Sequence, residues 1–229
     1  MSLFKQTADI QTADMLKLPV PKANYHNVVL KPSAYQMEMV KDLSERAERV
    51  RNRMVDSSVD NMLLITNDGR KLALDQRLIN PMLPDDENGK VSACAKNVFE
   101  IWQKTAEQKS TQMVFCDLST PHNDGNFNVY DGIRDKLLDM GIPKDQIAYI
   151  HNAASEAQKK ELFGKVRSGE IRVLIGSTQK MGAGTNVQKK LIALHHVDCP
   201  WRPSDVGRIL RTFKIKKNVE VTDNGKDNF

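Results

Sequence analysis

Short apolar runs alternate with amphipathic stretches from Ser110 onward, and this alternation is the clearest pattern in the chain. The runs have the length and apolar content of buried strands, whereas the stretches between them repeat with the period of a helix. The strands are predicted within Thr111–Ser119, Gln146–His151, Ile171–Thr178 and Lys190–Cys199, and the helices at Val129–Ile142, with Gly141 as its stop, and Ser155–Gly169, which Ser155 caps and Gly169 ends. Strands alternating with helices of this length predict right-handed βαβ units and a mainly parallel sheet, and hence an α/β fold.

Before residue 110 the pattern predicts mostly helices. A short strand is predicted at Asn27–Pro32, where the proline ends it. A helix follows over Ser33–Val55, with a serine as its N-cap and with Tyr35, Met39, Leu43, Ala47 and Val50 on one apolar face. We then expect a turn at Asn67–Gly69, a helical stretch that Pro81 ends, and a further helix over Lys90–Gln108.

Polar and glycine-rich segments follow the predicted strands of the second half. They are Asp117–Ser119, His151–Asn152, the glycine segment Ile175–Gln188, and Asp198–Trp201. The carboxyl ends of parallel strands meet at one edge of a sheet, and ligands bind there in open α/β folds. We therefore expect the functional loops of this chain to gather at that edge.

The composition indicates a soluble protein of the cytoplasm. Hydrophobic residues make up 40% and charged residues 28% of the 229 residues. No apolar run approaches the roughly 20 residues of a membrane-spanning helix, and the start of the chain lacks the layout of a secretion signal. Cys94, Cys116 and Cys199 are far apart and odd in number, which argues against a disulfide framework. We expect a cytoplasmic protein with no membrane partner.

The ligands that the composition favours are anions rather than metals. A net charge of +5 and a pI near 9.0 favour anionic partners, nucleic acid first. His195, His196 and Cys199 raise the idea of zinc, but adjacent strand residues point to opposite faces and no second cysteine pair is near. We therefore expect no metal site.

The glycine segment matches neither of the common phosphate-binding motifs. A Walker A loop needs Gly-Lys-Ser/Thr, whereas Gly184 is followed by Thr185 and Asn186. A dinucleotide fingerprint needs a third glycine, which Gly182–Val187 lacks. The glycines alone therefore indicate a structural turn, and the neighbouring residues must decide the function.

These neighbours carry a family resemblance. Residues 172–205, followed by Gly207–Arg211, resemble the second RecA-like lobe of superfamily II helicases, specifically the Swi/Snf-like translocases. The likeness is greatest to phage and plasmid helicases linked to adenine-specific DNA methylases. It extends weakly to Leu18–Trp102, which looks like the helical brace that joins two lobes in this family. The matching positions are Ser177, Thr178, Gly182, Gly184, Thr185, Asn186, Asp198, Trp201, Pro203, Arg208 and Arg211.

The resemblance implies roles for individual residues. In these motors ATP lies between two lobes, and the second lobe supplies an arginine finger, because charge on the transferred phosphoryl group needs a permanent cation. Arg211 is the expected finger, with Arg208 beside it. The other expected contacts are Gly182, Gly184 and Asn186 to the nucleotide, Thr178 and Gln179 to backbone phosphates of double-stranded DNA, and Ser119 and Asp198 near the path of the strand.

Two departures from the family pattern limit this interpretation. The spacing from Trp201 to each arginine is short by four residues, about one helical turn, as though a segment were missing between Val206 and Gly207. A true deletion would misplace the finger. In addition, the chain has no Gly-Lys-Ser/Thr loop and no acidic Mg²⁺ motif. It therefore holds half of an ATPase site, and we expect no ATP hydrolysis by the chain alone.

The sequence thus predicts an α/β chain with four parts. Residues 1–32 are a connector from a missing first lobe, 33–105 a helical brace, 106–211 the RecA-like helicase C-terminal lobe, and 212–229 a tail of unclear fold. ATP and Mg²⁺ are expected only in a longer protein that includes the first lobe, and a methylase domain is a further expected partner. The alternatives are a non-catalytic nucleic-acid-binding or regulatory module, and an unrelated α/β enzyme that uses His151 and Asp117 on a phosphorylated ligand.

Overall fold

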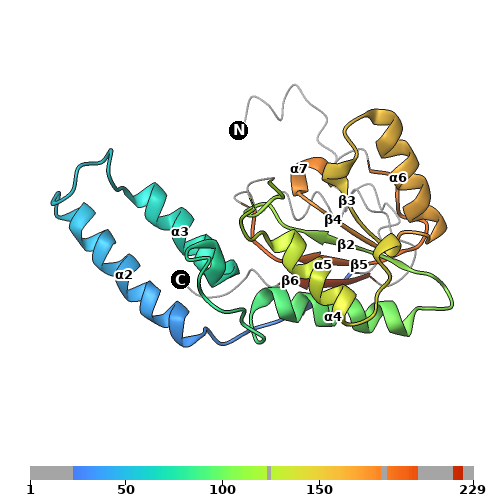
Figure 1. The fold of residues 1–229 in the computed structure, drawn as a ribbon, viewed down its shortest axis with the longest axis horizontal. Helices are drawn as coiled ribbons and strands as arrows, with labels where there is room; N and C mark the ends of the chain where they lie inside the picture. Colours follow the sequence, from blue (N-terminus) through green and yellow to red (C-terminus); the bar gives the residue numbers. More distant parts are fainter. Residues whose placement is uncertain (1–22, 123–124, 182–184, 201–218, 224–229) are drawn as a thin grey trace, which may run out of the picture.

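A parallel β-sheet forms the centre of the molecule (Figure 1). The computed structural model describes residues 23–122, 125–181, 185–200 and 219–223. Within these ranges the sheet has six strands in the order β1-β6-β5-β2-β4-β3, and each pair of neighbours is parallel. The strands are β1 (Ala23–Asn27), β2 (Thr111–Phe115), β3 (Ile147–Tyr149), β4 (Val173–Gly176), β5 (Leu191–His196) and β6 (Val219–Asp223). The mainly parallel sheet predicted from the alternating pattern is confirmed.

Helices cover both faces of this sheet. Helices α4 (Lys90–Lys104) and α5 (Val129–Asp139) pack on one face, against Val114 and Ile175 among others. Helix α6 (Glu156–Ser168) and the short helix α7 (Thr178–Met181) pack on the other, against residues such as Met113 and Leu174. Side chains of successive strand residues thus alternate between two apolar cores, as the pleat of a strand requires.

The helix ends follow the local signals. Ser155 forms a capping box with Gln158 at the start of α6, and Gly169 ends that helix with φ +81°. Gly141 follows α5 with φ +100°. Glycine adopts such left-handed conformations without the penalty that a Cβ brings. The predicted cap and stops are confirmed. Three short 3₁₀ helices, η1 (Gln76–Leu78), η2 (Lys144–Gln146) and η3 (Ile150–Asn152), complete the described connections.

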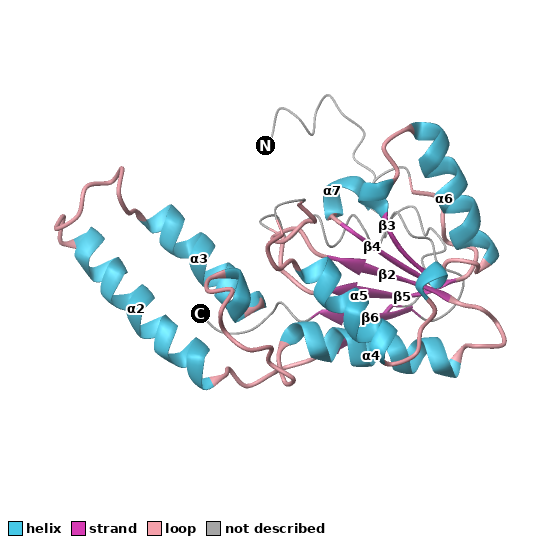
Figure 2. Cartoon of the chain, in the orientation of Figure 1, coloured by secondary structure: helices cyan, strands magenta, loops and turns pink. Residues whose placement is uncertain are grey.

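Helices α2 (Ala34–Arg51) and α3 (Met62–Leu74) form an antiparallel hairpin that projects away from the sheet (Figure 2). Ser33 caps α2 through a capping box with Gln36, as its sequence position predicts. None of the described helices is both long and apolar enough to cross a membrane. The predicted brace, residues 33–105, also contains α4, whose Val91, Cys94, Ala95 and Val98 are buried against the sheet side of the molecule. Its boundary at residue 105 stays a prediction.

Two sequence-based predictions are wrong. β1 covers Ala23–Asn27 and shares only Asn27 with the strand predicted at Asn27–Pro32, because the polar segment before that residue pairs with β6 through its backbone. The predicted turn at Asn67–Gly69 is absent, because α3 runs through these residues without interruption. In both places contacts with distant segments outweigh the local signal.

A buried arginine joins α4 to the sheet. Arg172, at the start of β4, is 3% exposed, and its guanidinium lies 5.1 Å from the ring centroid of Trp102. It donates to the carbonyls of Ser110 (3.1 Å), Trp102 (2.7 Å) and Thr105 (3.1 Å), and to the Thr105 hydroxyl (2.9 Å). Trp102 lies in the last turn of α4 and Thr105 is its C-cap, so two of these carbonyls lie where the negative end of the helix dipole favours a cation. Burial lowers the pKa of this guanidinium.

Candidate nucleic-acid interface

Two carboxylates join three loops at the carboxyl edge of the sheet. The side chain of Asp117, after β2, accepts a hydrogen bond at 2.7 Å from the backbone amide of Thr178, the first residue of α7 after β4. Asp198, after β5, accepts two more through Oδ2, from the amides of Asp117 (2.8 Å) and Leu118 (2.6 Å). The loops after β2, β4 and β5 are therefore held together by charge-assisted bonds. The expectation that these segments meet at one edge is confirmed.

Asp198 is the most deeply buried charged group of this cluster. It is 5% exposed, and burial raises the pKa of its carboxyl to about 6, with a further contribution from the charge of Asp117. The hydrogen bonds that it accepts from the amides of Leu118 and Asp117, and the charge of Arg70, lower this pKa and so oppose the shift. The thiol of Cys116 lies 3.8 Å from Oδ2, and burial raises the pKa of this thiol well above its usual value. Asp198 thus serves as an internal bridge between loops. Its predicted place near a DNA strand stays a prediction.

Helix α7 exposes one of the two residues predicted to contact phosphate. Gln179 is exposed, whereas Thr178 is buried, with its amide already bonded to Asp117. The hydroxyl of Ser177 accepts from the amide of Lys180 at 3.3 Å, and Met181 is completely buried. The packing of Met181 in the core therefore holds α7 on the sheet, and Gln179 faces solvent. A contact of Thr178 or Gln179 with phosphate stays a prediction.

Ser119 has an internal partner. It is buried, and its hydroxyl accepts from the amide of Val129 at 2.9 Å, while Asn128 accepts from the amide of Asp131 at 2.9 Å. Together the two side chains satisfy amides of the first turn of α5, which lack partners within the helix. The geometry accounts for Ser119 as a link between the β2 loop and α5, and its contact with a nucleic-acid strand stays a prediction.

The predicted nucleotide contacts are described in part. Asn186 is exposed, and its backbone carbonyl accepts from Nη1 of Arg167 in α6 at 2.8 Å. Gly182, Gly184, Arg208 and Arg211 lie outside the described residues. The described part therefore shows that the segment after α7 is anchored to α6, and the finger and glycine contacts stay predictions.

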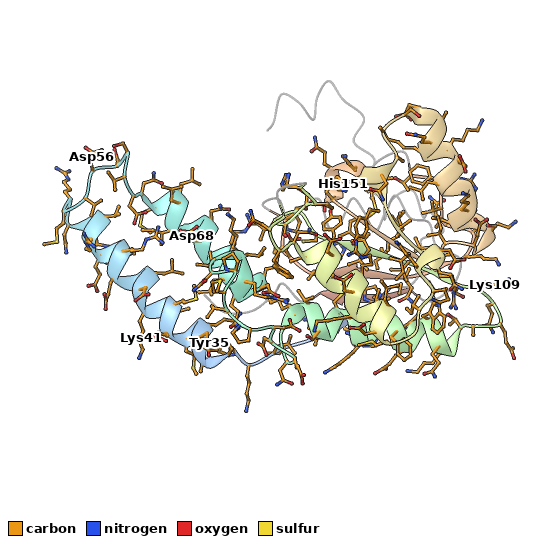
Figure 3. All side chains as sticks on the ribbon, in the orientation of Figure 1. Tyr35, Lys41, Asp56, Asp68, Lys109 and His151 are labelled. Carbon is orange, nitrogen blue, oxygen red and sulfur yellow. The ribbon has the colours of Figure 1, made fainter. Side chains whose placement is uncertain are left out.

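His151 and Asp117, the two residues named for the unrelated-enzyme alternative, have separate structural neighbours. His151, in η3 after β3, lies near α7 (Figure 3). Its ring packs edge-on against that of Tyr130 in α5, with ring centroids 5.3 Å apart. Its Nδ1 has no hydrogen-bond partner in the described part of the chain. Burial, with Lys180 and His122 as further causes, lowers the pKa of His151. The carboxylate of Asp117 accepts from the amide of Thr178, so it has a structural partner in the loop after β4. A catalytic role of the pair stays a prediction.

The two neighbouring histidines of β5 point to opposite faces, as predicted. His195 shares a 2.9 Å hydrogen bond with the side chain of Gln112, which in turn donates to the carbonyl of Val98 in α4. Burial lowers the pKa of His195 to about 3. His196 stacks on Phe115 in the other core, with centroids 5.0 Å apart. In the described ranges no three His, Cys, Asp or Glu side chains gather in a group that could hold a metal ion.

Sequence reasoning missed a link between the hairpin and this edge. Arg70 of α3 donates through Nη2 to the carbonyl of Cys199 at 2.6 Å, and Cys199 directly follows Asp198. The two residues lie 129 positions apart. A contact of this kind leaves no periodic or local signal, and only the fold brings its partners together. The hairpin therefore contacts the same loop that Asp198 ties to β2.

The comparisons with known proteins concern the fold. No protein-family model and no curated protein matches the sequence. The C-terminal part of the Fun30 ATPase domain is similar in structure, with a TM-score of 0.60 and 12% identity over 89% of this chain and 84% of that one. The C-terminal domain of the Sulfolobus solfataricus SWI2/SNF2 ATPase has a TM-score of 0.58 and 13% identity, over 88% of this chain and 80% of that domain.

A larger solved structure extends well beyond the region that matches this chain. The Sulfolobus solfataricus SWI2/SNF2 ATPase core, solved in complex with double-stranded DNA, has a TM-score of 0.54 and 14% identity over 88% of this chain. The matched region is 41% of that core. The chain therefore has the fold of the RecA-like helicase C-terminal lobe found in Swi2/Snf2 ATPases, which confirms the predicted fold class.

Proposed function

We propose that this chain is the second motor lobe of a Swi/Snf-like DNA translocase. In this role it supplies Arg211, with Arg208 beside it, as the arginine finger, and it contacts the DNA backbone through α7. A first lobe outside this chain supplies the Walker A lysine and the Mg²⁺ ligands. The link to an adenine-specific methylase is the most specific part of the proposal, and it rests on the sequence resemblance alone.

One observation carries the proposal. Helix α7, fixed to the β2 loop by Asp117, presents Gln179 to solvent directly before the predicted nucleotide segment Gly182–Asn186. This adjacency in the sequence supports a role in which one short stretch of chain contacts both DNA and nucleotide. A movement of this stretch between nucleotide states would shift the lobe along the backbone. A net charge of +5 suits a polyanion, and the related Sulfolobus core was solved with double-stranded DNA.

The residues of this chain contribute two physical effects. A bound ATP with Mg²⁺ would supply the transferred phosphoryl group, and an arginine, which stays protonated at every relevant pH, balances the charge on its oxygens. Asn186 suits a nucleotide contact, because its side chain is exposed while its carbonyl is held by Arg167. Gln179 can donate to a phosphate oxygen. Such contacts fix the position of DNA without reading its sequence.

Duplex binding tests the DNA half of the proposal. Fluorescence anisotropy with two labelled duplexes of unrelated sequence should give equal affinities, and binding should weaken with salt as counterions are released. Gln179→Ala should raise the Kd about fivefold, as for one lost hydrogen bond, and leave the salt slope unchanged because no charge is removed. Gln103→Ala, a matched change at an exposed glutamine of α4, should bind like the unaltered chain. Equal binding by the two variants would contradict the α7 contact.

The role of Arg211 as arginine finger can be tested only in the presence of a first lobe, which is outside this chain. In a motor reconstituted from this chain and a first lobe, Arg211→Ala should abolish DNA-stimulated ATP hydrolysis and leave duplex binding unchanged. A reconstituted motor that binds DNA but never hydrolyses ATP would support the alternative of a non-catalytic module. The four-residue shortfall between Val206 and Gly207 is the observation that favours this alternative.

A further inference from the structure

Asp117 is bonded at both its side chain and its backbone. Its carboxylate accepts from the amide of Thr178 at 2.7 Å, and its own amide donates to Asp198 at 2.8 Å. Asp198 also holds the amide of Leu118. One partly buried residue thus connects α7 to the deepest carboxylate of the carboxyl edge. Its residue type and position in the sequence indicate a role only in the alternative of an unrelated α/β enzyme.

We propose that Asp117 is a positioning residue, which holds α7 in the orientation that presents Gln179 to the DNA backbone. This inference rests on the proposed function. It concerns a residue that acts through Thr178 and does not touch the ligand itself.

The length of α7 is the first argument for this role. A helix of four residues, Thr178–Met181, is far below the length at which helices are stable in water, so its position depends on contacts outside the helix. The buried side of the helix is fixed by Met181, which lies in the core. Its first amide would lack a partner within the helix, and Asp117 provides that partner.

The charge of Asp117 is the second argument. A carboxylate at an edge that faces phosphates repels them, so its charge alone weakens DNA binding. Its carboxylate accepts a hydrogen bond from the first amide of α7, and the stabilisation of α7 by this bond offsets the repulsion. Asp117 is itself held in place, because its backbone amide donates to Asp198. Cys199, which follows Asp198, accepts a hydrogen bond from Arg70 of the hairpin. The positioning contact is thus fixed to the rest of the molecule.

These two effects of Asp117 have opposite signs, and duplex binding separates them. Asp117→Ala removes both the charge and the acceptor, and we expect about threefold weaker binding, because the gain from the lost charge offsets part of the loss expected for Gln179→Ala. Asp117→Asn removes the charge but keeps an acceptor for Thr178, and it should bind as tightly as the unaltered chain or slightly tighter. The control Asp145→Ala removes the same charge at an exposed site before β3, at the opposite edge of the sheet, and should not weaken binding.

Two further measurements complete the test. The double variant Asp117→Ala with Gln179→Ala should bind no more weakly than Gln179→Ala alone, because both substitutions remove the same contact, that of Gln179 with the DNA backbone. Amide hydrogen exchange at Thr178 should become at least about tenfold faster in Asp117→Ala and stay unchanged in Asp117→Asn, while the exchange of β2 and β4 shows that the sheet remains folded.

The outcomes distinguish the inference from the function on which it rests. If the unaltered chain does not bind duplex DNA, the proposed function fails, and this inference fails with it. If the chain binds but Asp117→Ala matches Asp145→Ala, or if the double variant shows the sum of both losses, the positioning role alone is overturned. Rescue by asparagine with slow exchange at Thr178 supports it.

Discussion

The sheet domain and the α2–α3 hairpin are built in different ways. In the sheet domain, strand and helix residues such as Val114, Ile133 and Leu174 are completely buried. In the hairpin, α2 contains no buried residue, and apolar side chains such as Leu63 (70% exposed) and Val40 (52% exposed) face solvent. The sheet domain is therefore stabilised by apolar burial on both faces, whereas α2 is held through its seam with α3, whose buried residues are Ile65, Leu72 and Leu74.

Polar contacts strengthen that seam. Arg46 of α2 donates to both carboxylate oxygens of Asp60 (2.8 and 2.9 Å) and to Asp68 of α3 (2.9 Å). The hydrogen bond and charge of Arg46 lower the pKa of Asp60. At the other end of α2, the Gln36 amide group donates to the carbonyl of Leu72 at 2.8 Å. Ion pairs that water reaches contribute little each. We therefore expect the hairpin to open locally at a lower free energy than the sheet.

Matched truncations of leucine give the largest expected effect. Leu174→Ala in β4 should lower the free energy of unfolding by about 3–4 kcal/mol, because a completely buried side chain leaves a cavity in a packed core. Leu43→Ala in α2, where the side chain is only partly buried, should cost about 1 kcal/mol or less. Urea unfolding followed by circular dichroism measures both. Equal costs would show that the hairpin seam is packed as tightly as the sheet.

Asp198→Asn should reveal a pH-dependent cost that belongs to the sheet domain. The pKa of this carboxyl rises from 3.8 to about 6 on folding, so the folded state keeps a proton that the unfolded state releases. The stabilisation by neutral Asp198 is complete below pH 4 and is lost as the pH rises through about 6. A shift of this size corresponds to roughly 3 kcal/mol. Asparagine stays neutral and can still accept from the amides of Asp117 and Leu118.

The measured quantity is the difference in unfolding free energy between Asp198→Asn and the unaltered chain at several pH values. This difference cancels the contributions of other groups, including His195, whose lowered pKa acts in the opposite direction. We expect it to move in favour of the variant by roughly 3 kcal/mol between pH 4 and pH 7. A difference that does not change with pH would show that Asp198 is ionised at no cost. In the hairpin Asp60 has a lowered pKa instead, so Asp60→Asn should lose no stability at low pH relative to the unaltered chain.

Local signals in the sequence predicted the sheet domain well. The Ser155 cap, the Gly169 stop and the buried strands depend on residues close together in the chain, and the structure confirms them. The joining of Asp117 to Thr178 spans 61 positions and that of Arg70 to Cys199 spans 129. No periodicity records such contacts. The sequence could therefore predict which loops meet at the carboxyl edge, because parallel strands impose it, but not which atoms join them.

The hairpin was predicted less well, for a related reason. Asn67–Gly69 is a turn signal when read alone, yet it lies inside α3, where Asp68 pairs with Arg46 and Gly69 faces Leu43 of α2. Contacts between the two helices thus decide the backbone conformation there. β1 shows the same effect in the sheet, since its polar sequence carries no strand signal and it forms by pairing with β6.

Glycine-to-alanine changes give the smallest effect and the sharpest test of whether the two regions open separately. A Cβ at Gly69 in α3 would lie 3.8 Å from the Leu43 side chain, and one at Gly164 in α6 would lie 3.9 Å from the Arg167 side chain, both ordinary contacts. Alanine is favoured over glycine inside a helix by about 0.5–1 kcal/mol, so each change should be stabilising. Gly69→Ala should slow amide exchange by about threefold in α2 and α3 and leave α6 unchanged, and Gly164→Ala should slow exchange in α6 but not in the hairpin. If either variant slows exchange in both regions, then the hairpin and the sheet unfold as one unit, and the thin seam between α2 and α3 is stronger than its exposed side chains indicate.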